Sequence, residues 1–123
     1  MPSNRTVEEA LALVSQIPTE LHRRGNMSMV ALVKESNYRT HQLSIGVEDI
    51  CRHLLINADL IGDWYVYSTN KRTNSGWYFD YDTQTVGYFN GSTRERVQTF
   101  DEVSKACATF IKYELDSIID HSS

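Results

Sequence analysis

The sequence predicts an α+β fold: a mainly helical single domain with a small antiparallel β-hairpin before a long C-terminal helix. Apolar residues recur at helical spacing through most of the chain, which indicates amphipathic helices. The spacing changes to alternation over residues 77–89, which is typical of paired strands. A long apolar stripe follows over residues 103–118. A chain of 123 residues can bury one core, so we expect one domain over 1–123 with flexible ends at 1–5 and 119–123.

The first third of the chain is predicted to form three short helices. Thr6 and Glu9 match a capping box, in which each side chain accepts a hydrogen bond from the other residue's backbone amide. Pro18 interrupts the first helix and suits the start of a second one, which Gly25 ends. Ser28 is the predicted N-cap of a third helix, with a strand as the alternative.

The middle of the chain is predicted to hold a loop and two further helices. Residues 38–44 are polar and are expected to form the loop. A helix begins at Gly46, with acidic residues in its first turn, where the helix dipole favours them. Its predicted buried face consists of Ile50, Cys51, Leu54 and Leu55. Residues 57–59 indicate a break and a new N-cap, and the next helix is expected to end near Tyr67.

The hairpin follows a polar connection. The predicted core-facing residues of its first strand are Trp77, Phe79 and Tyr81. Alternation then leaves Tyr78 and Asp80 facing outward. Residues 82–85 have the chemistry of a turn, 86–89 are predicted to form the second strand, and 90–92 end it. Because two strands alone are marginally stable in water, the hairpin must pack against helices or join further strands.

The last helix has the clearest amphipathic pattern. Thr99 and Glu102 match a second capping box at its start. Its apolar stripe consists of Val103, Cys107, Phe110, Ile111, Leu115 and Ile118. We expect this stripe to cover the core, and a partner-binding helix is the alternative.

The overall charge favours some partners over others. The chain has 16 acidic and 12 basic residues, a formal net charge of −4, so it has no long-range attraction to a phosphate backbone. A basic protein partner fits this charge better. The N-terminal sequence lacks the apolar region of a signal peptide, and no apolar run is long enough to span a membrane, so we expect a cytoplasmic protein. Cys51 and Cys107 match no metal or redox spacing and are expected to be free and packed.

No motif of catalysis, metal binding or nucleotide binding is present in the sequence. The four histidines form no ligand pair, and Cys51 and His53, two residues apart on a helix, do not face each other. We therefore expect a protein that is not an enzyme and that needs no cofactor or metal. Lys71 and Arg72 lie between two aromatic clusters, as in proteins that stack bases. Two positive charges are too few for strong nucleic-acid binding, which remains the weaker alternative.

Several of the sequence's segments resemble one bacterial family. The runs are 59–64 (DLIGDW), 67–72 (YSTNKR), 75–79 (SGWYF), 86–89 (VGYF) and 106–111 (ACATFI). Together they resemble small immunity proteins that are paired with polymorphic toxins, including those of contact-dependent growth inhibition systems. The resemblance extends over about residues 28–118.

This resemblance implies a function by protein binding. Such a protein binds the C-terminal domain of its cognate toxin in the cytoplasm and occludes the active site. The toxins are commonly nucleases, and cleavage of transfer RNA is a frequent activity. A mildly acidic inhibitor would suit the basic substrate groove of a nuclease. The chain carries Asn70 where the family pattern has an acidic residue. A monomer is favoured, and a non-enzymatic adaptor for another protein is the alternative function.

The candidate partner-binding residues combine carboxylates, aromatic rings and basic side chains around the aromatic stretch. Interfaces are enriched in aromatic residues and Arg, and charges that match the partner add specificity. The candidates are Asp59, Asp63, Lys71, Arg72, Tyr78, Asp80, Asp82 and Tyr88. These residues also have a plain structural interpretation. Asp59 and Asp63 suit the start of a helix, Asp80 and Asp82 suit a turn, and the tyrosines of the hairpin suit a solvated face.

Overall fold

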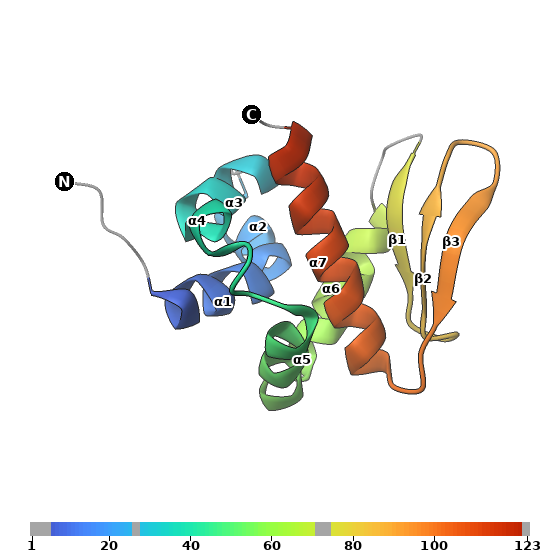
Figure 1. Ribbon diagram of the computed structural model, residues 1–123, viewed down its shortest axis with the longest axis horizontal. Helices are drawn as coiled ribbons and strands as arrows, with labels where there is room; N and C mark the ends of the chain where they lie inside the picture. Colours follow the sequence, from blue (N-terminus) through green and yellow to red (C-terminus); the bar gives the residue numbers. More distant parts are fainter. Residues whose placement is uncertain (1–5, 26–27, 71–74, 122–123) are drawn as a thin grey trace.

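The computed structural model describes residues 6–25, 28–70 and 75–121 and has the predicted α+β architecture (Figure 1). The elements in chain order are α1 (Val7–Ser15), α2 (Ile17–Arg24), α3 (Met29–Ser36), α4 (Tyr38–His41), α5 (Val47–Ile56), α6 (Asp59–Asn70), β1 (Gly76–Asp80), β2 (Thr85–Phe89), β3 (Arg94–Thr99) and α7 (Val103–His121). Helix α7 runs through the middle of the molecule, with α1 to α5 on one side and the sheet on the other. It therefore packs against both the N-terminal helices and the sheet.

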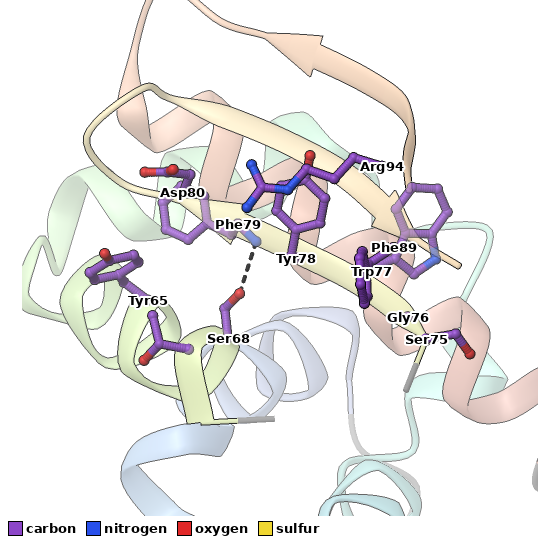
Figure 2. Close-up of a pocket in the computed structure, with 11 residues that line it drawn as sticks. Tyr65, Ser68, Ser75, Gly76, Trp77, Tyr78, Phe79, Asp80, Phe89 and Arg94 are labelled. Carbon is purple, nitrogen blue, oxygen red and sulfur yellow. Dashed lines mark hydrogen bonds between the residues drawn. The ribbon is translucent and has the colours of Figure 1, made fainter. Parts of the chain in front are cut away.

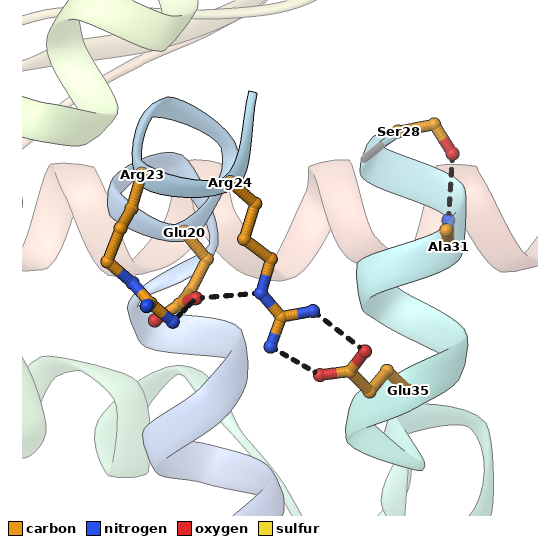
Figure 3. A network of polar contacts seen from close by, with 6 residues as sticks. All are labelled: Glu20, Arg23, Arg24, Ser28, Ala31 and Glu35. Carbon is orange, nitrogen blue, oxygen red and sulfur yellow. Dashed lines mark hydrogen bonds and ion pairs between the residues drawn. The ribbon is translucent and has the colours of Figure 1, made fainter. Parts of the chain in front are cut away.

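The N-terminal helices follow the caps in the sequence. The capping box at α1 is confirmed: Glu9 N donates to Thr6 Oγ1 at 3.1 Å, and Thr6 N donates to Glu9 Oε1 at 2.9 Å. Gly25 ends α2 with a φ of 76°, a conformation that suits glycine. Arg24 then joins α2 to α3 through two parallel 3.0 Å hydrogen bonds to Glu35 (Figure 3).

The predicted loop over residues 38–44 is wrong in its first half, which forms the single-turn helix α4. Asn37 adopts a left-handed φ of 63° and separates α3 from α4. Tyr38 follows it and is fully buried, so a polar segment contains one core residue. A single buried aromatic residue gives no periodic signal, which explains why the sequence pattern does not predict this helix.

Helices α5 and α6 differ from expectation at their ends. Leu55 was predicted to be buried but is 63% exposed, because the fully buried residues of α5 are only Ile50 and Leu54. Helix α6 continues to Asn70, beyond the expected end near Tyr67. Its Trp64 is fully buried and donates from Nε1 to the backbone oxygen of Ser15 at 2.9 Å, which fixes α6 against the end of α1.

The predicted hairpin is present as β1 and β2. Trp77 pairs with Tyr88 and Phe79 pairs with Val86, and these four side chains lie on the face toward α7. The prediction that Tyr81 faces the core is wrong, because β1 ends at Asp80 and the Tyr81 side chain in the turn is 43% exposed.

A third strand, β3, extends the hairpin to an antiparallel sheet of order β1-β2-β3. All six residues of β3 are exposed, and the register with β2 shifts between Val86 and Tyr88. Arg96 has a positive φ of 54° in this irregular part of the strand. The predicted capping box at Thr99 is wrong, since Thr99 ends β3 opposite Thr85 and α7 begins only at Val103.

Helix α7 supplies the centre of the core. Phe110 is fully buried, and its ring centroid lies 6.1 Å from that of Trp64 on α6 and 6.1 Å from that of Phe79 on β1. One side chain therefore joins the helical half to the sheet. The helix continues through the buried Ile119 to His121, beyond residue 118, after which we expected the chain to fray.

Candidate functional site

A hollow of the described surface lies along β1, between α6 and the outer face of the sheet (Figure 2). Its volume is ≈ 340 Å³. We call it the aromatic pocket, lined by Tyr65, Ser68, Thr69, Ser75, Gly76, Trp77, Tyr78, Phe79, Asp80, Phe89 and Arg94. Most of these residues come from the aromatic stretch at 64–81, so the pocket forms where that stretch folds back on itself.

Helix α6 and strand β1 both line the aromatic pocket, and a hydrogen bond joins them. Phe79 N donates to Ser68 Oγ at 2.8 Å, so an amide at the edge of the sheet has a partner on the helix. The Tyr65 ring packs edge-on against Phe79, with centroids 6.1 Å apart. A polar residue that we had assigned to the connection therefore fixes the helix to the sheet.

The outer part of the pocket depends on a missing side chain at Gly87. Tyr78 lies directly across the ladder from Gly87, and its ring covers that position. A Cβ atom on Gly87 would lie 2.5 Å from Tyr78 Oη, so no larger residue fits without moving the ring. Arg94 of β3 lies over the same ring, with Cζ 4.8 Å from the centroid. Among the described residues, no carboxylate forms an ion pair with Arg94.

The structure brings Tyr78 and Asp80 of the predicted set together at the aromatic pocket, but Asp80 also has a structural role. Its Oδ1 accepts from the backbone amides of Asp82 at 3.1 Å and Thr83 at 3.4 Å. This geometry holds the β1–β2 turn, as expected for Asp at a turn. Asp82 is exposed in the turn and does not line the pocket.

The other predicted residues lie elsewhere. Asp59 is exposed at the start of α6, and Asp63 accepts a 2.6 Å hydrogen bond from Thr19 Oγ1. Neither carboxylate lines the aromatic pocket, which α6 borders with Tyr65, Ser68 and Thr69. Lys71 and Arg72 lie outside the described residues.

Tyr88 is on the opposite face of the sheet from Tyr78. Its ring packs edge-on against Trp77, with centroids 5.2 Å apart, on the side toward α7. The two tyrosines therefore cannot contribute to one flat contact surface. Phe89 and Arg94 pair across β2 and β3 and both line the pocket, although neither is among the residues predicted from the sequence. Only a prediction of β3 could have placed Arg94 beside Tyr78.

The other His, Cys and Asp side chains that could carry chemistry show no arrangement typical of a metal or nucleophile site among the described residues. Within the described ranges, no group of three or more His, Cys, Asp or Glu side chains is arranged to hold a metal ion. Cys51 and Cys107 are free thiols, and burial, with a smaller contribution from Cys51, raises the pKa of Cys107. A raised pKa keeps that thiol protonated and weakly nucleophilic at neutral pH. Asp49 accepts from Gly46 N at 2.9 Å and forms an ion pair with Arg52 at 3.4 Å.

No helix in the described part of the chain combines the length and apolar character that crossing a membrane requires. No family model matches the sequence. No curated protein and no solved structure matches the chain either.

Proposed function

We propose that the chain binds a toxin domain and neutralises it, as the resemblance to immunity proteins implies. The observation that best supports a protein-binding role is the composition and exposure of the aromatic pocket. It presents the half-buried Tyr65 and Tyr78 with the exposed Phe89 and Arg94, and aromatic residues and Arg are enriched at protein interfaces.

The pocket also has unused contact capacity. Phe89 is 37% exposed, and no described helix covers the outer face of the sheet on which it lies. The Arg94 guanidinium lies over the Tyr78 ring, and none of its N–H groups donates to a described residue, so they can meet a partner's carboxylate or carbonyl groups. A partner side chain that enters the pocket would remove aromatic surface from water and meet these donors at the rim.

The choice of a toxin as the partner rests on the resemblance and the charge. The formal charge of −4 suits a basic partner such as a nuclease. The gene order provides the first check: a reading frame for a large secreted toxin directly upstream would supply the partner. The C-terminal domain of that toxin should bind this protein, and co-expression should restore growth to cells that produce the toxin.

The binding site is tested by calorimetry with the same toxin domain. Phe89→Ala and Arg94→Gln should each weaken binding by roughly 30-fold, the loss that defines a hot spot. Leu43→Ala and Arg52→Gln are matched controls, because both side chains are exposed on the helical half. They should leave the affinity unchanged.

Other outcomes would assign a different function. Tight, salt-sensitive binding to transfer RNA without binding to the toxin domain would favour the nucleic-acid alternative. A normal affinity in both pocket variants would move the interface elsewhere on the surface. A gene context without a toxin, together with capture of another bacterial protein, would favour an adaptor.

A further inference from the structure

A second hollow region lies on the other face of the sheet, between α7 and β3. Two adjoining hollows of ≈ 430 Å³ and ≈ 400 Å³ share Trp77, Arg96 and Tyr113. We call them together the α7–β3 groove, and its character is set by Trp77, Tyr88, Glu95, Tyr113, Asp116 and Asp120. Trp77 also lines the aromatic pocket, so the groove and the pocket lie at the same end of the sheet.

Aromatic rings form one side of the α7–β3 groove. The centroids of Trp77 and Tyr113 are 4.4 Å apart with planes inclined by 36°, and Tyr88 packs edge-on against Trp77. Tyr113 also donates from its hydroxyl to Gln98 Oε1 at 3.1 Å, which fixes its ring between α7 and β3. All three rings are half-buried, so their outer surfaces are accessible. The faces of Trp and Tyr rings attract cations.

Carboxylates form the rim, and they retain free acceptors. Asp116 accepts from Tyr38 Oη at 2.6 Å, and each of its polar contacts is made by Oδ1. Its Oδ2 has no partner among the described residues. Asp120 is exposed and has no polar partner in the described part of the chain. Glu95 accepts through Oε2 from Asn90 Nδ2 at 2.9 Å, which leaves Oε1 available.

The position of two of these carboxylates adds to the negative potential. Asp116 and Asp120 lie in the last two turns of α7, which ends at His121. The C-terminal end of a helix carries a partial negative charge, so carboxylates there reinforce it and do not stabilise the helix. Arg96 is the basic residue that borders the groove, and it forms no ion pair with Glu95 or either aspartate among the described residues. Lys112 lies 3.7 Å from Asp116 and offsets its charge, so Glu95 and Asp120 against Arg96 leave the groove with one net negative charge.

We infer that the α7–β3 groove binds an arginine side chain of a basic partner protein. Arginine suits the site better than lysine, because a planar guanidinium can stack on Trp77 or Tyr113 and still donate two parallel hydrogen bonds to a carboxylate. This inference rests on the proposed function, since it names the chemistry that the toxin domain would present. The shared Trp77 lets one partner contact the groove and the aromatic pocket together.

The inference is tested with an acetylated hexa-arginine peptide at low ionic strength. The ¹⁵N-labelled protein contains two tryptophans, so the indole N–H resonances of Trp77 and the buried Trp64 report separately. We expect the peptide to shift the Trp77 resonance and leave that of Trp64 in place. A hexa-lysine peptide should bind more weakly.

Charge removal separates the groove from the general charge of the protein. Glu95→Gln with Asp120→Asn should weaken hexa-arginine binding by about tenfold, because two surface ion pairs are lost. Glu8→Gln with Glu48→Gln changes the net charge equally at exposed sites on α1 and α5, and should have less than a twofold effect. Equal losses in the two double variants, or no loss in the first, would overturn the inference.

A ring variant and the toxin domain complete the test. Tyr113→Leu keeps apolar volume but removes the π face, and should also weaken hexa-arginine binding while circular dichroism shows an unchanged fold. If the toxin domain binds the wild-type protein and the Glu95/Asp120 double variant equally well, the inference fails and the proposed function stands. If no toxin domain binds but hexa-arginine binding depends on the groove, the proposed function fails and the anionic site stands.

Discussion

Lys112 on α7 provides the sharpest test of how the fold is held together. Its Nζ donates to Tyr38 Oη, to the backbone oxygen of Gln42 and to the backbone oxygen of Ile45, each at 2.7 Å. Asp116 lies 3.7 Å from the same nitrogen and accepts from Tyr38. One ammonium group therefore joins α7 to the irregular segment between α4 and α5.

Replacing Lys112 with Met keeps most of the aliphatic stem and removes the three donors. Hydrogen bonds to charged groups contribute about 1.5–3 kcal/mol each, and breaking a buried pair costs about 3–5 kcal/mol. The Lys112 side chain is 17% exposed, so water can partly replace the lost donors. We therefore expect the free energy of unfolding to fall by about 3 kcal/mol.

The measurement is urea unfolding followed by circular dichroism and tryptophan fluorescence. A loss of this size should lower the midpoint by about 1–2 M urea at an unchanged slope. Lys105→Met on the same helix is the matched control, because that lysine is 48% exposed and its ion pairs to Asp101 and Glu102 lie at 3.4 and 3.6 Å. Its midpoint should match the wild type. If Lys112→Met and Lys105→Met unfold at the same urea concentration, the ammonium network does not stabilise the fold.

Two further predictions concern the sheet and a buried phenol. Gly87→Ala should displace the Tyr78 ring, lower the free energy of unfolding by about 1 kcal/mol and weaken partner binding, and both effects should appear in the same variant when unfolding and calorimetry are compared. Burial, with the charge of Glu114, raises the pKa of Tyr67 above its ordinary value of 10.0, so its contribution to stability is complete below about pH 10 and is lost as the pH rises beyond it. Unfolding midpoints between about pH 9 and 12 should fall less in Tyr67→Phe than in the wild type, whereas Tyr81→Phe, at an exposed position, should follow the wild type.

The parts of the fold that the sequence predicts are those with local signals. The capping box at Thr6 and the stop at Gly25 act through neighbouring backbone groups, and both are present as predicted. The hairpin is visible because side chains alternate on both of its strands. Strand β3 has no such signal, since its residues 94–99 are all exposed and its register with β2 is irregular. Because the sequence does not predict β3, Thr99 was predicted to cap a helix, a position that its side chain would also suit.

The candidate site was harder to predict, because its geometry depends on residues that are distant in sequence. The aromatic residues of the stretch 64–81 could be divided by periodicity into a helix and a strand, and Trp64 and Phe79 are indeed core residues. The neighbours of a residue on the adjacent strand depend on the strand register. That register places Tyr78 opposite Gly87 and Phe89 opposite Arg94. Proximity in sequence suggested the carboxylates Asp59 and Asp63, which the fold places outside the aromatic pocket.

Strand β3 connects these observations to function. It supplies Arg94 to the aromatic pocket and Glu95 to the α7–β3 groove, because adjacent residues of a strand point to opposite faces. Both hollows therefore depend on the pairing of β3 with β2, and the β3 side chains that line them are exposed and do not pack in the core. A strand with six exposed residues adds little buried apolar area to the core, so its contribution to stability is small. Its physical effect is to place charged groups of opposite sign beside aromatic rings, a combination enriched at protein interfaces, and the proposed partner binding depends on it.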